Sequence, residues 1–265
     1  MNNPVLVKGA GDLATGVAHR LFRCGMQVVM TEVQQPTVVR RSVSFAEAVY
    51  ESSHSVEGVT ACLVGTATRA REVLQQGQIP VLVDPHAAEA LKLKPDVLVD
   101  AVMSKKNTGT KITDAPVVIG LGPGFTAGVD VHAVVETNRG HHLGRVILSG
   151  SAQPNTGIPG PVGGYTRERL LRSPADGIFI PCVDIKSQVQ AGDILGYVDN
   201  QPVRAGISGL LRGFIRGGIP VRRGLKIGDI DPRGNIEYCN TISDKARAVA
   251  GGVLEAILYL GKYRN

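Results

Sequence analysis

The stretch VLVKGAGDLATGVAHRLFRCGMQVVMTEV, residues 5–33, governs the architecture of the N-terminal half of the chain. An apolar run ends in Gly-Ala-Gly-Asp, a segment with helical spacing follows, and a second apolar run ends at Glu32. This order predicts a strand over 4–8, a helix over 13–24 and a strand over 27–32. A strand, a helix and a second strand in this order begin a parallel α/β sheet.

The loop between the first strand and the helix matches the pattern G-x-G-x-x-G/A at Gly9, Gly11 and Ala14, and Glu32 lies 21 positions beyond Gly11. In a nucleotide site of this kind Gly9 makes the turn, Gly11 lets a pyrophosphate approach the backbone, and Glu32 accepts hydrogen bonds from ribose hydroxyls, which favours NAD over NADP. Asp12 either caps the helix or repels a phosphate, and Lys8 stands where a strand interior is normally apolar. A nucleotide site and a plain strand–turn–helix joint therefore both stay open.

Helical and strand periods continue to alternate up to residue 150. Strands are expected at 58–65, 79–85, 95–103, 115–122, 133–138 and 143–148, and helices at 44–51 and 67–77. This alternation predicts a Rossmann-like α/β domain over residues 1–150 with a largely parallel sheet. Residues 149–166, with five Gly and three Pro, are predicted to be a linker or a mobile loop.

A second glycine-rich stretch, residues 117–147, follows a predicted strand. Its glycines, Gly120, Gly122 and Gly124, could place backbone amides around an anion. Polar residues lie downstream, and we expect them to line a cleft: Asp130, His132, Glu136, Arg139, His141 and His142. The spacing of the first three does not suit a tight metal triad, so no metal site is predicted.

Four basic residues are candidates for binding an anion. Arg40 and Arg41 could clamp a phosphate or carboxylate, or be surface arginines before a capped helix. Lys105 follows a predicted strand end, and Arg139 lies within the second glycine-rich stretch, downstream of its three glycines. We expect a small anionic ligand.

The C-terminal half shows an apparent internal repeat, because residues 175–199 align without a gap on residues 207–231, at a period of 32. The pattern resembles the barrel-sandwich hybrid of biotinyl and lipoyl domains, and predicts a small all-β module over residues 165–235. The joint 199–206 has no lysine, so it is not predicted to carry a swinging arm. A helix over 241–265, with Ser243 as N-cap, is expected to pack back, and Gly251 and Gly252 predict close packing there.

Composition excludes several classes of protein. The net charge is +6, and residues 151–265 hold 15 Lys and Arg against 10 Asp and Glu, but aromatic residues are few and no nucleic-acid motif appears. The four cysteines form no C-x-x-C pair, so neither a zinc knuckle nor a redox dithiol is indicated. No signal peptide or membrane-spanning run is seen, which predicts a cytoplasmic protein without a membrane partner.

Several longer phrases resemble one known family: 8–21, 39–51, 56–61, 120–147, 173–179 and 192–199. They are similar to the accessory proteins of selenium-dependent molybdenum hydroxylases, which are grouped with xanthine dehydrogenase maturation factors. The resemblance implies an intracellular role in maturing or supplying such an enzyme, with the molybdenum hydroxylase apoenzyme as partner. It implies no firm catalytic residues.

Three functional hypotheses follow. The first is a maturation factor that binds a nucleotide, or the phosphorylated pterin of the molybdenum cofactor, between the two domains. The second is an NAD-dependent oxidoreductase with His132 and His141 as acid–base candidates, and the third is a non-catalytic docking scaffold. No nucleophile elbow, P-loop or catalytic carboxylate pair appears. Whether any reaction is catalysed and whether the chain forms a homo-oligomer are left open.

Overall fold

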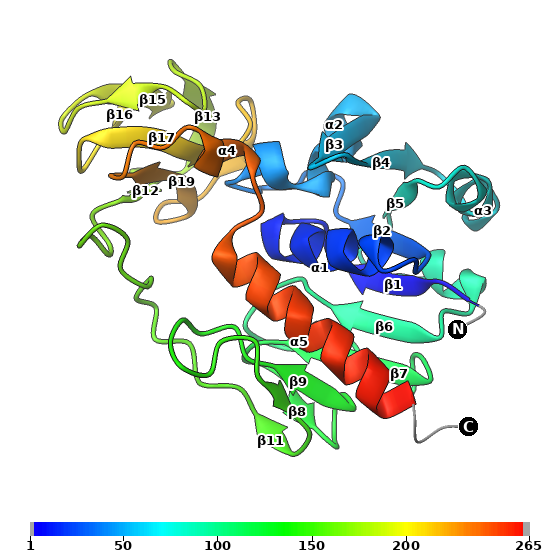
Figure 1. Ribbon diagram of the computed structural model, residues 1–265. Coiled ribbons are helices and arrows are strands. Elements are labelled where there is room, and N and C mark those ends of the chain that lie inside the picture. The colour runs from blue at the N-terminus through cyan, green and yellow to red at the C-terminus, as the bar shows by residue number, and fades with distance from the viewer. Residues whose placement is uncertain (1–2, 262–265) are drawn as a thin grey trace. The chain divides into compact units, whose positions relative to one another are not determined.

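The computed structural model describes residues 3–261, which form two compact units (Figure 1). Unit 1 contains the described residues 3–36, 44–155 and 242–261, and unit 2 contains residues 37–43 and 156–241. Each unit has its own buried core. No helix within residues 3–261 combines the length and the apolar character that crossing a membrane requires.

Unit 1 is built on a nine-stranded sheet in the order β10-β9-β7-β6-β1-β2-β5-β4-β3. Its strands are β1 (Val5–Lys8), β2 (Val28–Glu32), β3 (Ser53–Val56), β4 (Val59–Val64), β5 (Ile79–Val83), β6 (Val97–Asp100), β7 (Val117–Leu121), β9 (Ala133–Val135) and β10 (Val146–Ile147). The strands from β9 to β4 pair in parallel, and β10 and β3 pair antiparallel at the two edges. β8 (Thr126–Ala127) and β11 (Gly150–Ser151) form a separate antiparallel pair.

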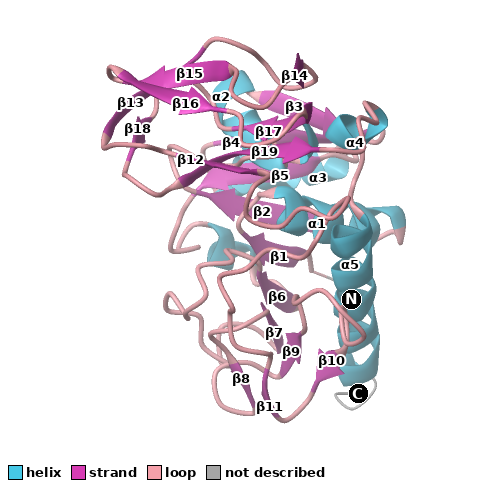
Figure 2. Ribbon diagram, turned by 90° about the vertical axis from the view of Figure 1, so that its left-hand side faces the viewer, coloured by secondary structure: helices cyan, strands magenta, loops and turns pink. Residues whose placement is uncertain are grey.

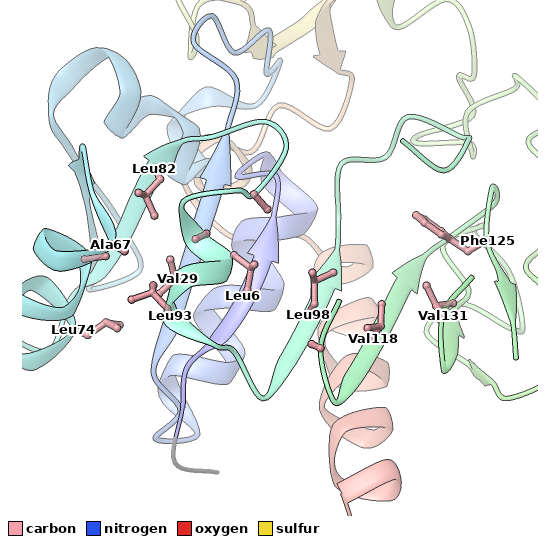
Figure 3. Packing of buried hydrophobic residues seen from close by; sticks show 14 of the residues in the cluster. Leu6, Val29, Ala67, Leu74, Leu82, Leu93, Leu98, Val118, Phe125 and Val131 are labelled. Carbon is pink, nitrogen blue, oxygen red and sulfur yellow. The ribbon is translucent and has the colours of Figure 1, made fainter. Parts of the chain in front are cut away.

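Helices cover both faces of this sheet. On one face α1 (Asp12–Arg23) and α5 (Asp244–Gly261) run beside each other (Figures 1 and 2). On the other face one apolar cluster includes Leu6 and Val29 beside residues of α3 (Ala67–Gln75) and of the 3-10 turn η3 (Ala90–Leu93), and continues through Leu98 and Val118 towards Phe125 and Val131, as Figure 3 shows. The shorter elements are η1 (Arg41–Val43), η2 (Phe45–Glu47) and α2 (Ala48–Glu51). Both faces of the parallel strands are therefore buried, and apolar side chains on either face contribute to the core.

The close packing predicted for the C-terminal helix is confirmed at one of its two glycines. A Cβ at Gly252 would lie 2.1 Å from the carbonyl oxygen of Gly144, whereas a Cβ at Gly251 would meet nothing nearer than Arg20 Nη1 at 4.0 Å. Ser243 caps the helix as predicted, because its Oγ accepts a hydrogen bond from the Ala246 amide at 3.2 Å. Gly252 is thus required by contact, and Gly251 is not.

Unit 2 consists of two four-stranded antiparallel sheets. One has the order β12 (Leu170–Arg172), β19 (Lys226–Asp231), β17 (Gly209–Phe214), β14 (Gln188–Val189), and the other β16 (Gln201–Arg204), β15 (Ile194–Val198), β13 (Gly177–Pro181), β18 (Pro220–Val221). Phe179 and Phe214 meet edge to face at 4.7 Å between ring centroids in the core. Arg212 lies 3.7 Å from Asp231 in a buried ion network, and its Nε donates to the carbonyl of Tyr238 in α4 (Glu237–Asn240).

The predicted fold class is wrong for unit 2. In unit 1 the sheet is largely parallel, and the antiparallel strands β10 and β3 at its edges make it mixed. β3 and β4 form a hairpin through Glu57 and Gly58, which both have positive φ. The predicted 32-residue repeat and barrel-sandwich module are not shown, and two antiparallel sheets stand in their place. Gly192 and Gly224, which align in the supposed repeat, lie in turns at φ +94° and +82°. Tight turns between short antiparallel strands demand such glycines repeatedly, so their recurrence alone does not establish a repeat.

The two glycines of α5 give a matched pair of substitutions. Gly251→Ala should raise the free energy of unfolding by about 1 kcal/mol, because alanine is the better helix former and the new methyl has room. Gly252→Ala should lower it by about 1–3 kcal/mol, because the methyl overlaps the Gly144 carbonyl. Urea unfolding of both variants measures this, and equal effects at the two positions would contradict the packing described for α5.

Candidate functional site

The carboxyl edge of the parallel strands in unit 1 brings together the loops after β1, β2, β6 and β7. From β1 the chain passes through α1 to β2 on one side, and it later returns to place β6 on the other side of β1. The chain therefore leaves β1 and β6 in opposite directions, and the point between these two strands is the switch point of the sheet. Open α/β sheets bind ligands outside the carboxyl ends of their strands at such a point.

The loop after β1 makes the turn that the sequence predicts for it. Gly9 has φ +89°, and its N–H donates to the carbonyl of Thr31 at 2.8 Å. Gly11 is the N-cap of α1 and supplies no side-chain cap, and Asp12 is the first residue of the helix rather than its N-cap. The first amides of a helix attract anions when no side chain caps them.

Glu32, at the end of β2, lies against this loop. Its Oε2 accepts a hydrogen bond from the Ala10 amide at 2.8 Å, and its Oε1 accepts one from the Val33 amide at 2.8 Å. Burial raises the pKa of the Glu32 carboxyl above its ordinary value, and these two hydrogen bonds oppose that rise. The structure therefore places the Glu32 carboxylate beside the turn that contains Gly9 and Gly11.

Lys8 and Asp100, the last residues of β1 and β6, form a buried polar cluster with Thr110. Lys8 Nζ donates to Thr110 Oγ1 at 2.6 Å and lies 3.5 Å from Asp100 Oδ2, while the Thr110 hydroxyl donates to the same carboxylate at 2.5 Å. All three residues are at most 5% exposed. Sequence reasoning registered Lys8 only as an anomaly and missed Asp100 and Thr110, because the partners lie about a hundred positions away.

Close contacts explain the three glycines of the second glycine-rich stretch. A Cβ at Gly120 would meet the Phe125 ring at 2.5 Å, and one at Gly122 would meet Thr137 Oγ1 at 2.4 Å. The Gly122 amide already donates to the Val135 carbonyl. At Gly124 a Cβ would lie 2.7 Å from the backbone of Lys106. Anion binding by these glycines stays a prediction.

The polar residues downstream accept backbone hydrogen bonds. Asp130 accepts from the Thr126 amide at 2.8 Å, and His132 Nδ1 accepts from the Val118 amide at 2.9 Å. The buried Glu136 accepts from the amides of residues 138 and 153. These contacts fix loops, and residues 3–261 contain no group of three or more His, Cys, Asp or Glu side chains placed to hold a metal ion.

The four basic candidates lie in different surroundings. Arg40 and Arg41 belong to unit 2, where Arg40 donates to the carbonyls of Tyr238 and Thr241 and Arg41 to that of Phe214. Arg139 forms a two-pronged ion pair with Asp244 in unit 1. Lys105 is exposed in the loop that follows β6. Of these four candidates, Lys105 is the one in a loop at the switch point.

The Lys8 cluster should govern the stability of unit 1. Lys8→Met leaves Asp100 buried without its cation, and this should lower the free energy of unfolding by about 3–5 kcal/mol. The double variant Lys8→Met/Asp100→Asn removes the uncompensated charge and should recover most of that loss. Urea unfolding measures both, and a Lys8→Met variant as stable as the double variant would contradict an interaction between the two charges.

Comparison with known proteins gives one strong likeness in sequence. No family model matches the chain. The uncharacterized protein YqeB of Escherichia coli (strain K12) is 49% identical over 256 residues, which cover 97% of this chain and 47% of YqeB. The chain thus spans about half the length of this relative.

The likenesses to solved structures are weak. The ectoine utilization protein EutE (DoeB) of Ruegeria pomeroyi, with product bound, has a TM-score of 0.25 at 15% identity, covering 86% of this chain and 84% of that chain. An aspartoacylase family protein of Mesorhizobium loti has a TM-score of 0.27 at 12% identity, covering 86% and 85%. A succinylglutamate desuccinylase of Silicibacter has a TM-score of 0.24 at 15% identity, covering 86% and 84%. Scores this low assign neither a fold nor an activity to the chain.

These findings correct the resemblance drawn from the sequence. The solved structures named above are an ectoine utilization protein, an aspartoacylase family protein and a succinylglutamate desuccinylase, and the sequence relative is uncharacterized. None of them is described as a maturation protein of a molybdenum hydroxylase. The assignment to that family is therefore wrong. The three functions predicted from the sequence, which are maturation factor, NAD-dependent oxidoreductase and docking scaffold, are wrong as well.

Proposed function

We propose that unit 1 binds a nucleotide of the NAD type at the carboxyl edge of β1 and β2. The phosphates lie at the first amides of α1, and the ribose hydroxyls donate to Glu32. The proposal concerns binding within unit 1 and names no reaction. A molybdenum cofactor, the other ligand expected from the sequence, stays an untested prediction, as does a partner protein.

The observation that carries the proposal is the hydrogen bond from the Ala10 amide to the Glu32 carboxylate at 2.8 Å. This hydrogen bond fixes the Glu32 side chain beside the glycine turn after β1. The turn leads into α1, whose N-cap is Gly11. A carboxylate can accept about four hydrogen bonds, so two backbone amides leave room for two ribose hydroxyls. A 2′-phosphate would meet the negative charge of Glu32, which supports NAD over NADP as the ligand.

A plain strand–turn–helix joint would need the glycine turn but not the carboxylate. Partial burial of Glu32 removes water from its carboxylate, which is unfavourable for the charged form and raises the pKa of this carboxyl. A neutral side chain would avoid that cost, so the carboxylate supports a role beyond making the turn. A cytoplasmic location, where such nucleotides are abundant, belongs to the same proposal.

Substitution of Glu32 tests the proposal. Glu32→Gln should weaken NAD binding about 10-fold to 100-fold, because a hydrogen bond to a charged acceptor contributes about 1.5–3 kcal/mol. Wild-type affinity should also fall as pH decreases towards the raised pKa of Glu32, since the protonated carboxyl accepts fewer hydrogen bonds, and Glu32→Gln should remove this pH dependence. Isothermal titration calorimetry from pH 5 to pH 8 measures both effects.

The matched control is Glu255→Gln, which changes an exposed carboxylate on α5 and should leave binding unchanged. Wild-type protein that shows no saturable binding of NAD, ADP-ribose or ADP would overturn the proposal. Equal loss of affinity in both variants would remove Glu32 from the site.

A further inference from the structure

The loop over residues 101–110, between β6 and the segment leading to β7, is anchored at both ends. At its start the Ala101 amide donates to the Lys8 carbonyl at 2.9 Å. At its end Thr110 joins the buried cluster with Lys8 and Asp100. The Asn107 side chain braces the return, since it accepts from the Thr110 amide and donates to the Thr110 carbonyl, each at 2.8 Å.

Gly9 and Gly124, which belong to two other loops, contact different parts of the backbone of the 101–110 loop. A Cβ at Gly9 would lie 3.1 Å from the Ala101 oxygen, and a Cβ at Gly124 would lie 2.7 Å from the Lys106 amide and Cα. Both glycines also have positive φ, at +89° and +109°. The 101–110 loop therefore lies between the first and the second glycine loops, and both glycines are needed for its close approach.

The loop carries charge of the sign that a phosphate requires. Lys105 and Lys106 are adjacent and exposed, and both lie in the part of the loop that Gly124 contacts. Asp100, the last residue of β6, lies just before this loop and is buried. Its carboxylate accepts a hydrogen bond from Thr110 and lies beside the Lys8 ammonium. Its negative charge is thus compensated inside the sheet, and the exposed part of the loop presents two cations.

We propose that Lys105 and Lys106 bind the diphosphate of the nucleotide, and that Thr110 is a positioning residue that holds their loop through Lys8 and Asp100. This inference rests on the proposed function and deepens it, because it makes a nucleoside diphosphate group the recognised feature. It also assigns the second glycine loop a role, because the absence of a side chain at Gly124 permits close contact with the backbone of the two lysines.

The test compares ADP with adenosine, which lacks the phosphates. Lys105→Ala/Lys106→Ala should weaken ADP binding at least 10-fold and leave adenosine binding unchanged. The control Lys92→Ala/Lys94→Ala removes the same charge from exposed positions at the end of η3 and should leave both affinities unchanged. Isothermal titration calorimetry at two salt concentrations measures the affinities, and the salt dependence of ADP binding should decrease only in the first variant.

Thr110→Val and Thr110→Ser test the positioning role. Valine keeps the shape and loses the hydroxyl, so ADP affinity should fall about 10-fold with adenosine affinity unchanged, and serine should restore it. A folded Thr110→Val variant that binds ADP as tightly as the wild type would overturn the role of Thr110. If the valine variant does not fold, weakened ADP binding by Thr110→Ser would overturn that role instead. ADP binding unaffected by loss of both lysines would overturn the inference while leaving the proposed function intact. No ADP or NAD binding by wild-type protein would overturn both.

Discussion

The charged pair of Lys8 and Asp100 is the constraint on which the carboxyl edge of unit 1 depends. An ammonium and a carboxylate at the ends of two central parallel strands are almost fully buried, so each requires the other and a further hydrogen-bonding partner. Thr110 supplies that partner, and it thereby ties the end of the 101–110 loop to the strands where the loop begins. The position of the 101–110 loop at the candidate site follows from this compensation.

The second constraint is the close approach of one backbone segment to another. It explains glycines to which a sequence motif would assign only a role in binding a ligand. Gly124 packs on the backbone of Lys106, Gly252 packs on Gly144, and neither position has room for a methyl group. Gly11 has a different place in the structure, because it is the N-cap of α1. A glycine-rich stretch therefore contains positions that close packing requires, and only the three-dimensional contacts identify them.

Local pattern predicted the first three elements of unit 1 well, but not β3, β8 or β11. The strand, helix and strand expected from residues 5–33 are β1, α1 and β2, because apolar periodicity reports which face of a local element is buried. The partners of Lys8 could not be predicted, since they lie 92 and 102 positions away. Spacing also misled in unit 2, where recurring turn glycines suggested a repeat, and similar phrases suggested a family that the comparisons do not support.

The most direct test of nucleotide binding at this edge is to follow backbone amide resonances by NMR during titration with NAD. The account predicts saturable shifts at Ala10, at the first residues of α1, at Val33 and in the 101–110 loop, with the amides of unit 2 unchanged. Shifts confined to unit 2, or no saturable shift at Ala10 and Val33, would contradict it.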